Sequence, residues 1–363
     1  MAQHTVDEFP YVSVIMPVYN EADFIGKSVR SVLGQNYPKD RMELIVADGM
    51  STDGTREIVR ETAAEAEVPV TIVDNPKRIA PAALNRALQE AKGKIVVRID
   101  GHCEVDHDYV LNCVRLLQDR KADGVGGPIE TIGGGAVAEA IALAMSSSFG
   151  VGGSAFRTVN DREMYTDTVA FPAYTREIIE RVGQFNEELV RNQDDEYNFR
   201  IRKMGGRILL SPEIRSKYYS RSSFRSLWRQ YFQYGYWKVR VLQLHPRQMS
   251  LRQFVPLAFL VSVAVFSVAS FFSTAAVWLL AVVTASYLIG NLLASIVAAG
   301  NRVSLVPLVS LSFAILHFSY GFGWMFGIVS FRNGWNGERL VAEDRLKAVQ
   351  GHRTEESPSE PGA

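Results

Sequence analysis

Acidic side chains follow four short apolar runs near the start of this 363-residue chain. The runs cover residues 12–16, 43–47, 70–73 and 94–99. The acidic side chains after them are Glu21, Asp48, Asp53, Asp74 and Asp100, and the imidazole of His102 follows Asp100. Carboxylates are the ligands that Mg²⁺ prefers, and imidazole suits Mn²⁺ or later metals. Each residue alone could cap a helix or make a turn, but together they favour a site for a polar ligand and a metal ion.

A second acidic group lies at residues 191–200, where the sequence reads Arg-Asn-Gln-Asp-Asp-Glu-Tyr-Asn-Phe-Arg. Asp194, Asp195 and Glu196 would occupy the first turn of a helix that ends near Gly205. Acids in this position can simply stabilise the helix dipole. A carboxylate here could instead remove a proton from a reacting hydroxyl group, a step that typically accelerates a reaction about 10²- to 10⁴-fold.

Alternating elements must position these side chains. Helical patterns lie between the apolar runs, for example at residues 55–65 and 81–91, and this alternation predicts βαβ units. The runs are uniformly apolar, so we expect strands covered on both faces in a mostly parallel, doubly wound sheet. Ligands of such sheets bind beyond the carboxyl ends of the strands, which is where the acidic residues fall.

Several motifs in the right order carry a family resemblance. The runs VSVIMPVYNE, VADGMSTDGT and RIDGH, with the helix that contains Asn85, resemble the nucleotide-sugar-binding half of an inverting family 2 glycosyltransferase. Within that family they are similar to bacterial exopolysaccharide enzymes of the succinoglycan type. The resemblance extends from about residue 11 to residue 240. It implies an α/β fold of GT-A type, with a Rossmann-like sheet and helices on both faces.

The resemblance also implies roles for the residues at the strand ends. Glu21 and Asp48 would hold the nucleoside, with Asp48 binding the base and Asp53 supporting its loop. The full set expected to bind the donor nucleotide is Pro17, Tyr19, Glu21, Asp48, Asp53, Asn85 and Asp100.

The metal is expected where the family usually has Asp-x-Asp and this chain has Asp100-Gly101-His102. Asp100 and His102 would hold a divalent cation, Mn²⁺ or Mg²⁺, that bridges the two phosphates of the donor. A residue spacing of two in an extended segment puts both side chains on one side. His102 could alternatively be a hydrogen-bonding neighbour that never touches the metal.

For the acidic helix, the family pattern is Glu-Asp-x-[Asp/Glu] with an Arg four residues later. Aligning Glu196 and Arg200 with that pattern puts Asp194 at the position of the catalytic base. Gln193 replaces the usual Glu, so Asp195 remains a second candidate for the catalytic role.

The remainder of the chain points to a membrane. Residues 214–252 carry nine Lys or Arg and no acid, interleaved with aromatic residues, which is typical of a helix lying on an anionic membrane surface. This position against a membrane argues against nucleic acid as a partner.

Apolar segments follow at 254–272, 276–299 and 304–331, each long enough to span a bilayer. Basic residues before the first span predict a cytoplasmic domain. Three spans would put the tail outside, yet its Arg332, Arg339, Arg345 and Lys347 favour the inside, so the number of crossings stays open.

We therefore expect an extension (1–10), a GT-A-type domain (11–212), a basic aromatic interfacial segment (213–252), about three transmembrane helices (253–331) and a polar tail with a disordered end (332–363). The predicted function is transfer of one sugar from a nucleoside diphosphate sugar to a lipid-linked oligosaccharide. The predicted protein is a multi-pass inner-membrane enzyme that also contacts membrane lipids. With two cysteines and no signal peptide, its thiols should face the cytosol. The alternatives are a polyprenyl-phosphate glycosyltransferase, a nucleotidyltransferase, which would want a glycine-rich basic loop after the first strand, and a non-enzymatic membrane scaffold.

Overall fold

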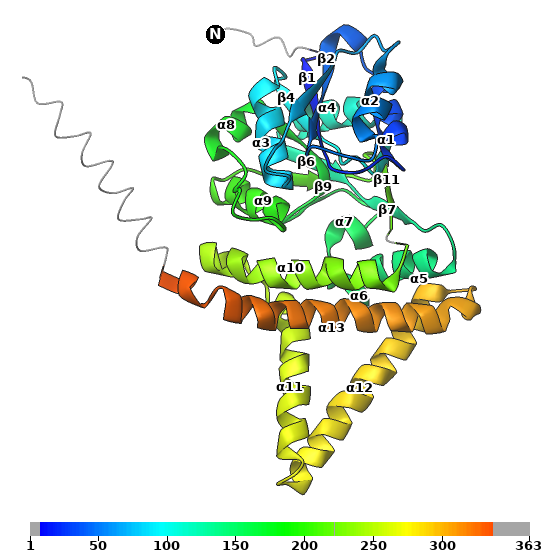
Figure 1. The fold of residues 1–363 in the computed structure, drawn as a ribbon, viewed down its shortest axis with the longest axis vertical. Coiled ribbons are helices and arrows are strands. Elements are labelled where there is room, and N and C mark those ends of the chain that lie inside the picture. Colours follow the sequence, from blue (N-terminus) through cyan, green and yellow to red (C-terminus); the bar gives the residue numbers. More distant parts are fainter. Residues whose placement is uncertain (1–7, 221, 337–363) are drawn as a thin grey trace, which may run out of the picture.

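The computed structural model of the protein describes residues 8–220 and 222–336 (Figure 1). An eight-stranded sheet has the order β3-β2-β1-β4-β9-β6-β10-β8. Its strands are β1 (Val12–Val18), β2 (Met42–Asp48), β3 (Val70–Asp74), β4 (Ile95–Arg98), β6 (Gly124–Gly127), β8 (Met164–Tyr165), β9 (Ala170–Thr175) and β10 (Ile208–Leu210). β9 and β8 run antiparallel to their neighbours, and the other pairs are parallel. The predicted mostly parallel α/β sheet is therefore confirmed.

Helices cover both faces of this sheet because alternate strand residues point to opposite sides. Val14 and Met16 share one apolar cluster with residues of α1 (Ile25–Leu33), α2 (Thr55–Ala63) and α4 (Tyr109–Arg120). Ile15 joins a second cluster with residues of α3 (Ala80–Glu90), α8 (Arg176–Val182) and α9 (Gln193–Lys203). A smaller sheet of β5 (Cys103–Val105), β11 (Ser216–Tyr219) and β7 (Ile129–Ile132) extends the domain.

A layer of helices lies below the domain in Figure 1. The short helices α5 (Ala136–Met145), α6 (Ser148–Val151) and α7 (Ala155–Thr158) lead into it, and α10 (Phe224–Leu244) runs along it. Within the described residues, three segments form helices long and apolar enough to cross a membrane: 251–269, 274–299 and 303–330. They contain α11 (Val255–Ala269), α12 (Thr274–Ala299) and α13 (Val306–Ser330).

These three helices are not arranged alike. In Figure 1, α11 and α12 project away from the domain as a hairpin, whereas α13 runs alongside α10. The chain then ends its described part in a short 3-10 helix, Arg332–Asn336. The predicted disorder at the end of the tail falls outside the described residues.

Candidate functional site

The strand ends meet as the parallel pairing requires. Val18 of β1 pairs with Asp48 of β2, and Asp48 pairs with Asp74 of β3, so the residues that follow these strands share one edge of the sheet. β4 lies on the other side of β1. The residues expected to bind the donor therefore come together around the end of β1, except where noted below.

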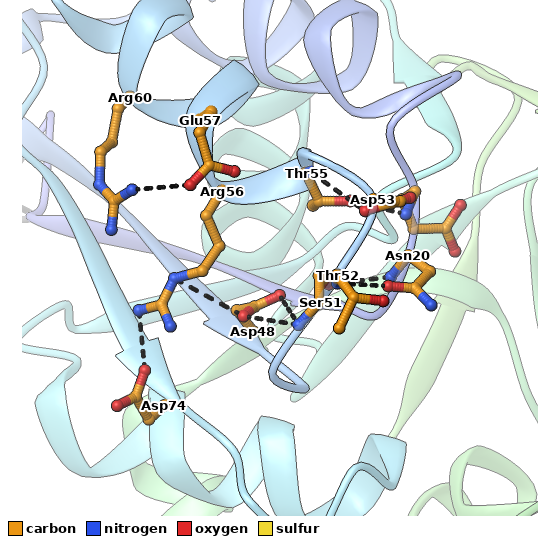
Figure 2. Close-up of polar contacts among 11 residues, drawn as sticks. Asn20, Asp48, Ser51, Thr52, Asp53, Thr55, Arg56, Glu57, Arg60 and Asp74 are labelled. Carbon is orange, nitrogen blue, oxygen red and sulfur yellow. Dashed lines mark hydrogen bonds and ion pairs between the residues drawn. The ribbon is translucent and has the colours of Figure 1, made fainter.

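Figure 2 shows the end of β2, where Asp48 organises the loop that follows it. The Asp48 side chain is only 1% exposed, accepts the backbone N–H of Ser51 at 3.1 Å, and lies 3.7 Å from Nε of Arg56. Arg56 also donates to Asp74 at 2.7 Å. In this structure Asp48 thus holds the loop, and its contact with a nucleotide base stays a prediction.

Asp53 joins this loop to the start of the first helix. Its carboxylate accepts hydrogen bonds from the Thr55 hydroxyl at 2.6 Å and from the backbone N–H of Ala22 at 3.0 Å. Partial burial acts to raise the pKa of Asp53, but these hydrogen bonds outweigh it and lower the pKa. Asp53 is therefore a charged anchor beneath the loop, consistent with the supporting role expected of it.

The end of β1 crosses over the end of β2. Tyr19 is 45% exposed and its ring lies over Gly49, where an added Cβ would approach the ring at 3.0 Å. Asn20 has a positive φ of 53° and accepts the backbone N–H of Thr52 at 2.9 Å. Pro17, one residue before the end of β1, is partly exposed at the same edge. This crossing leaves Tyr19 as an exposed aromatic face on which a base could stack.

At the end of β4, Nδ1 of His102 lies 2.9 Å from Oε1 of Glu21. Between Asp100 and His102, Gly101 fits against Val18, where an added Cβ would come within 2.9 Å of a Val18 methyl group. The pair of Glu21 and His102 joins the ends of β1 and β4. It also fixes the imidazole so that its other nitrogen, Nε2, is the one left for a ligand.

A buried arginine connects the two acidic groups predicted from the sequence. The Arg98 side chain is 8% exposed and donates to Oδ1 of Asp100 at 2.8 Å while forming an ion pair with Oδ1 of Asp194. Burial acts against the charged guanidinium, but the two carboxylates raise the pKa of Arg98, so it stays charged. Asp194 therefore lies at the rim of the sheet, beside the residue expected to hold the metal.

The two candidates for the catalytic base face different partners. Oδ1 of Asp194 is buried against Arg98, while 35% of the side chain remains exposed. Burial raises the pKa of Asp194, and Asp100 and Asp195 add to this, while Arg98 acts in the opposite direction. Asp195 instead accepts a hydrogen bond at 2.6 Å from Lys238 of α10, and this contact raises the pKa of Lys238 against the effect of burial.

Asn85 does not reach this rim. Its side chain is buried and bonds the loop that precedes α9, donating to the carbonyl of Phe185 at 3.0 Å and to Glu187 at 2.9 Å. Its Oδ1 accepts the backbone N–H of Phe185 at 2.8 Å. In this structure Asn85 positions that loop, and its contact with the donor stays a prediction.

The possible metal ligands at the end of β4, Asp100 and His102, fit a metal ion that a bound substrate also coordinates. Within residues 8–220 and 222–336, no three His, Cys, Asp or Glu side chains converge into a complete metal site. Asp100 offers a partly exposed carboxylate, and the imidazole of His102 is 19% exposed. Catalytic Mg²⁺ and Mn²⁺ are commonly held by one or two side chains plus substrate phosphates, so two protein ligands are enough.

Comparison with known proteins identifies the family. The family model "Glycosyl transferase family 2" matches residues 13–183. Over 326 residues the chain is 30% identical to the succinoglycan biosynthesis protein ExoA of Rhizobium meliloti, covering 88% of this chain and 95% of that protein. The chain belongs to glycosyl transferase family 2.

Other members of the family and one solved structure extend this finding. The chain is 31% identical over 232 residues to the dolichyl N-acetyl-alpha-D-glucosaminyl phosphate 3-beta-D-2,3-diacetamido-2,3-dideoxy-beta-D-glucuronosyltransferase of Methanococcus voltae, covering 62% of this chain and 72% of that protein. The mannosyltransferase PcManGT from Pyrobaculum calidifontis, solved in complex with GDP-Man and Mn²⁺, superimposes with a TM-score of 0.56 at 23% identity over 87% of each chain. The GT-A-type fold indicated by the sequence motifs is thus confirmed.

Two site residues of this family 2 chain were missed by the sequence analysis. Arg98 and Lys238 are both buried, and each pairs with an acid of α9. A signal existed, because Arg98 is a charged residue inside a buried apolar strand, and such residues are almost always paired. The identity of its partners depended on the fold, which brings Asp194 next to β4.

Proposed function

We propose that the protein is a membrane-anchored, inverting glycosyltransferase that moves one sugar from a nucleoside diphosphate sugar to a lipid-linked oligosaccharide. The observation that carries this proposal is the pairing of Arg98 with both Asp100 and Asp194. It puts a carboxylate suited to proton abstraction next to one suited to holding the donor's metal. The family match supports glycosyl transfer, and the mannosyltransferase of the same fold was solved with GDP-Man and Mn²⁺, a nucleoside diphosphate sugar and a divalent cation.

The transfer can be written with this chain's own residues. Asp194 accepts the proton of the acceptor hydroxyl as that oxygen bonds to the anomeric carbon from the face opposite the nucleotide. The bond between the sugar and the donor phosphate breaks, and the nucleoside diphosphate leaves with the bonding electrons. Arg98 holds Asp194 in place, and Tyr19 and the loop after Asp48 bind the nucleoside. A divalent cation on Asp100 and His102 would neutralise charge on the leaving diphosphate.

The membrane side of the proposal rests on α10. This helix contacts α9 through Lys238 and Asp195, so the acidic helix lies directly on the helical layer that contains α10 and α13. A sugar acceptor carried on a lipid could then reach Asp194 without leaving the bilayer. We propose the cytoplasmic face of the inner membrane, because basic residues flank the apolar region and both cysteines, Cys103 and Cys113, are free and buried.

A direct assay tests the reaction. Membranes containing the protein are incubated with a panel of radiolabelled nucleoside diphosphate sugars, and lipid-linked products are extracted and treated with mild acid. We expect one labelled sugar to appear at the end of a lipid-linked oligosaccharide. Label on a bare lipid monophosphate would indicate a polyprenyl-phosphate glycosyltransferase instead. Absence of labelled lipid with every donor would contradict the proposal.

A further inference from the structure

α13 has the length and composition of a membrane span, yet it packs along α10. Both helices run in the same direction: Phe232 and Tyr236 of α10 contact Gly323 and Gly327 of α13 in the same order. An added Cβ on Gly323 would lie 2.1 Å from the carbonyl oxygen of Phe232, so the two backbones touch. Beyond the end of α13, Gln243 of α10 donates to the carbonyl of Phe331 at 2.6 Å. The contact therefore extends through the C-terminal half of α13.

α10 cannot enter the hydrocarbon region. Arg225 and Arg229 are exposed on its first two turns, and Arg240 bonds Glu188 of the domain at 2.8 Å. Exposed arginines are costly at the centre of a bilayer, and the domain itself would have to follow α10 into it. A helix that lies parallel to α10 and touches its backbone must stay at the same depth.

The other end of α13 is also tied to the domain. Arg302, just before the 3-10 helix Val303–Leu305 that leads into α13, forms an ion pair with Glu139 of α5. α13 also packs on α5 and α6 in its N-terminal half, where the ring of Phe313 lies 5.0 Å from that of Phe149. Both ends of this helix are thus fixed to the same body, on the same side of the hairpin of α11 and α12 (Figure 1).

We propose that α13 lies in the plane of the membrane surface beside α10, and that only the hairpin of α11 and α12 enters the bilayer core. The segment 251–269 is about 28 Å long as a helix, close to the ~30 Å of a hydrocarbon core. No charged residue lies between Arg252 and Arg302. Exposed apolar side chains of α13, such as Phe326 and Val329, then contact lipid from the interface.

This arrangement has a consequence for the chain's topology. An even number of passages through the core returns the chain to the side of the domain, so residues after α13 face the same compartment as the sheet. Arg332, which follows Phe331, then lies on the same side as the basic residues of α10, as the positive-inside rule requires. The inference concerns membrane topology alone and does not depend on the proposed sugar transfer.

Thiol labelling tests this in the full-length, membrane-embedded protein. Val303 and Trp335 flank α13 and are 71% and 50% exposed, so Val303→Cys and Trp335→Cys report the two ends of the helix. Glu61→Cys on the exposed side of α2 reports the side of the domain, and the unmodified chain, whose own cysteines are buried, gives the background. Each variant is treated with a membrane-impermeant maleimide in inside-out vesicles and in intact spheroplasts.

We expect the three engineered thiols to react from the same side, to within about twofold after normalising to labelling in detergent. Reaction of Val303→Cys and Trp335→Cys from opposite sides would show that α13 spans the membrane and would overturn the proposal. So would a Trp335→Cys thiol that reacts in detergent but from neither side of the membrane, because that would put the end of α13 inside the bilayer.

Discussion

The guanidinium of Arg98 connects the part of the site proposed to bind the sugar donor with the part proposed to bind the acceptor. Arg98 bonds Asp100, at the end of β4, and Asp194, at the start of α9, although the two acids are far apart in the sequence. The charged Arg98 compensates carboxylate charge where water is excluded, and it opposes the rise that burial causes in the pKa of Asp194. The proposed mechanism therefore assigns two tasks to this site, metal binding at Asp100 and proton abstraction at Asp194.

Substitution of these two acids separates the tasks in an experiment. Asp194→Asn keeps the shape of the side chain and removes the proton acceptor, so turnover should fall by about 10²-fold or more. Affinity for a nucleoside diphosphate in the presence of metal should stay near that of the wild type. Asp100→Asn should weaken nucleotide binding first. Both are measured as kcat together with nucleotide affinity by calorimetry.

The opposite results would reassign the base. Asp195→Asn is the matched control, since its carboxylate bonds Lys238 of α10 and not Arg98. Full activity in Asp194→Asn beside an inactive Asp195→Asn would move the catalytic role to Asp195. Equal loss of nucleotide affinity in Asp194→Asn and Asp100→Asn would contradict the division of roles.

His102 sets the expected metal preference. With Nδ1 facing Glu21, Nε2 can ligate a cation, and imidazole favours Mn²⁺ over Mg²⁺. We expect higher activity with Mn²⁺ in the wild type and a shift toward Mg²⁺ in His102→Asp, measured as the ratio of initial rates with the two metals. Glu21→Gln keeps the imidazole and should keep the Mn²⁺ preference. An unchanged ratio in His102→Asp would leave His102 outside the metal site.

At the level of elements, the contact between α10 and α13 depends on glycines. Gly235 on α10 faces the backbone of α13, and Gly323 on α13 faces the backbone of α10. An added Cβ would lie 2.0 Å and 2.1 Å, respectively, from a carbonyl oxygen, far inside van der Waals contact. Small residues at such a contact let two helices approach until their backbones touch. The position of α13 therefore depends on the absence of side chains at these glycines rather than on its apolar side chains.

Gly323→Ala tests this contact with one added carbon. Because the opposing atom is backbone and cannot rotate away, we expect a loss of about 1–3 kcal/mol in the free energy of unfolding, seen as a lower midpoint of thermal unfolding in detergent. Gly134→Ala is the control, since an added Cβ there meets no atom within 4 Å. Equal midpoints for the two variants would mean that the helices separate easily.

At the scale of the whole molecule, the protein is a catalytic domain on a flat helical layer, with one apolar hairpin beneath it (Figure 1). The hairpin's outward side chains are apolar, for example Val265 of α11 at 55% exposure and Leu288 of α12 at 60%. A water-soluble protein would bury such surfaces, whereas lipid solvates them. In the proposed arrangement, membrane attachment has two parts, insertion by the hairpin and surface contact by α10 and α13.

A charge in the middle of the hairpin should weaken this insertion. Leu288→Arg would cost about 2.5–3.5 kcal/mol near the centre of a bilayer. We expect a smaller fraction of the protein to remain in membranes after alkaline carbonate extraction, measured by quantitative immunoblotting. Glu61→Arg introduces the same side chain on the domain surface and should leave the fraction unchanged. Equal retention of both variants would indicate that Leu288 does not face lipid.

The sequence by itself determined the features that depend on residues close together in the chain. Alternating apolar runs and helical patterns predicted a mostly parallel sheet, because burial on both faces requires runs such as residues 12–16. Motifs at the strand ends indicated the family, and the long apolar segments predicted the helices that could enter a membrane. These features depend on neighbouring residues alone, so composition and spacing were enough.

Only the tertiary structure decided which distant residues meet. Asp194 and Glu21, which pair with Arg98 and His102, lie on distant parts of the chain. The surroundings of Asp194 and Asp195 differ because β4 approaches one and α10 the other. Asn85, which the family resemblance assigns to donor binding, holds the loop before α9 through Phe185, a contact that the sequence did not indicate. α13 has the composition of a membrane span, yet glycine contacts hold it along a charged helix. Hydropathy reports what a segment can tolerate, and packing decides where it lies.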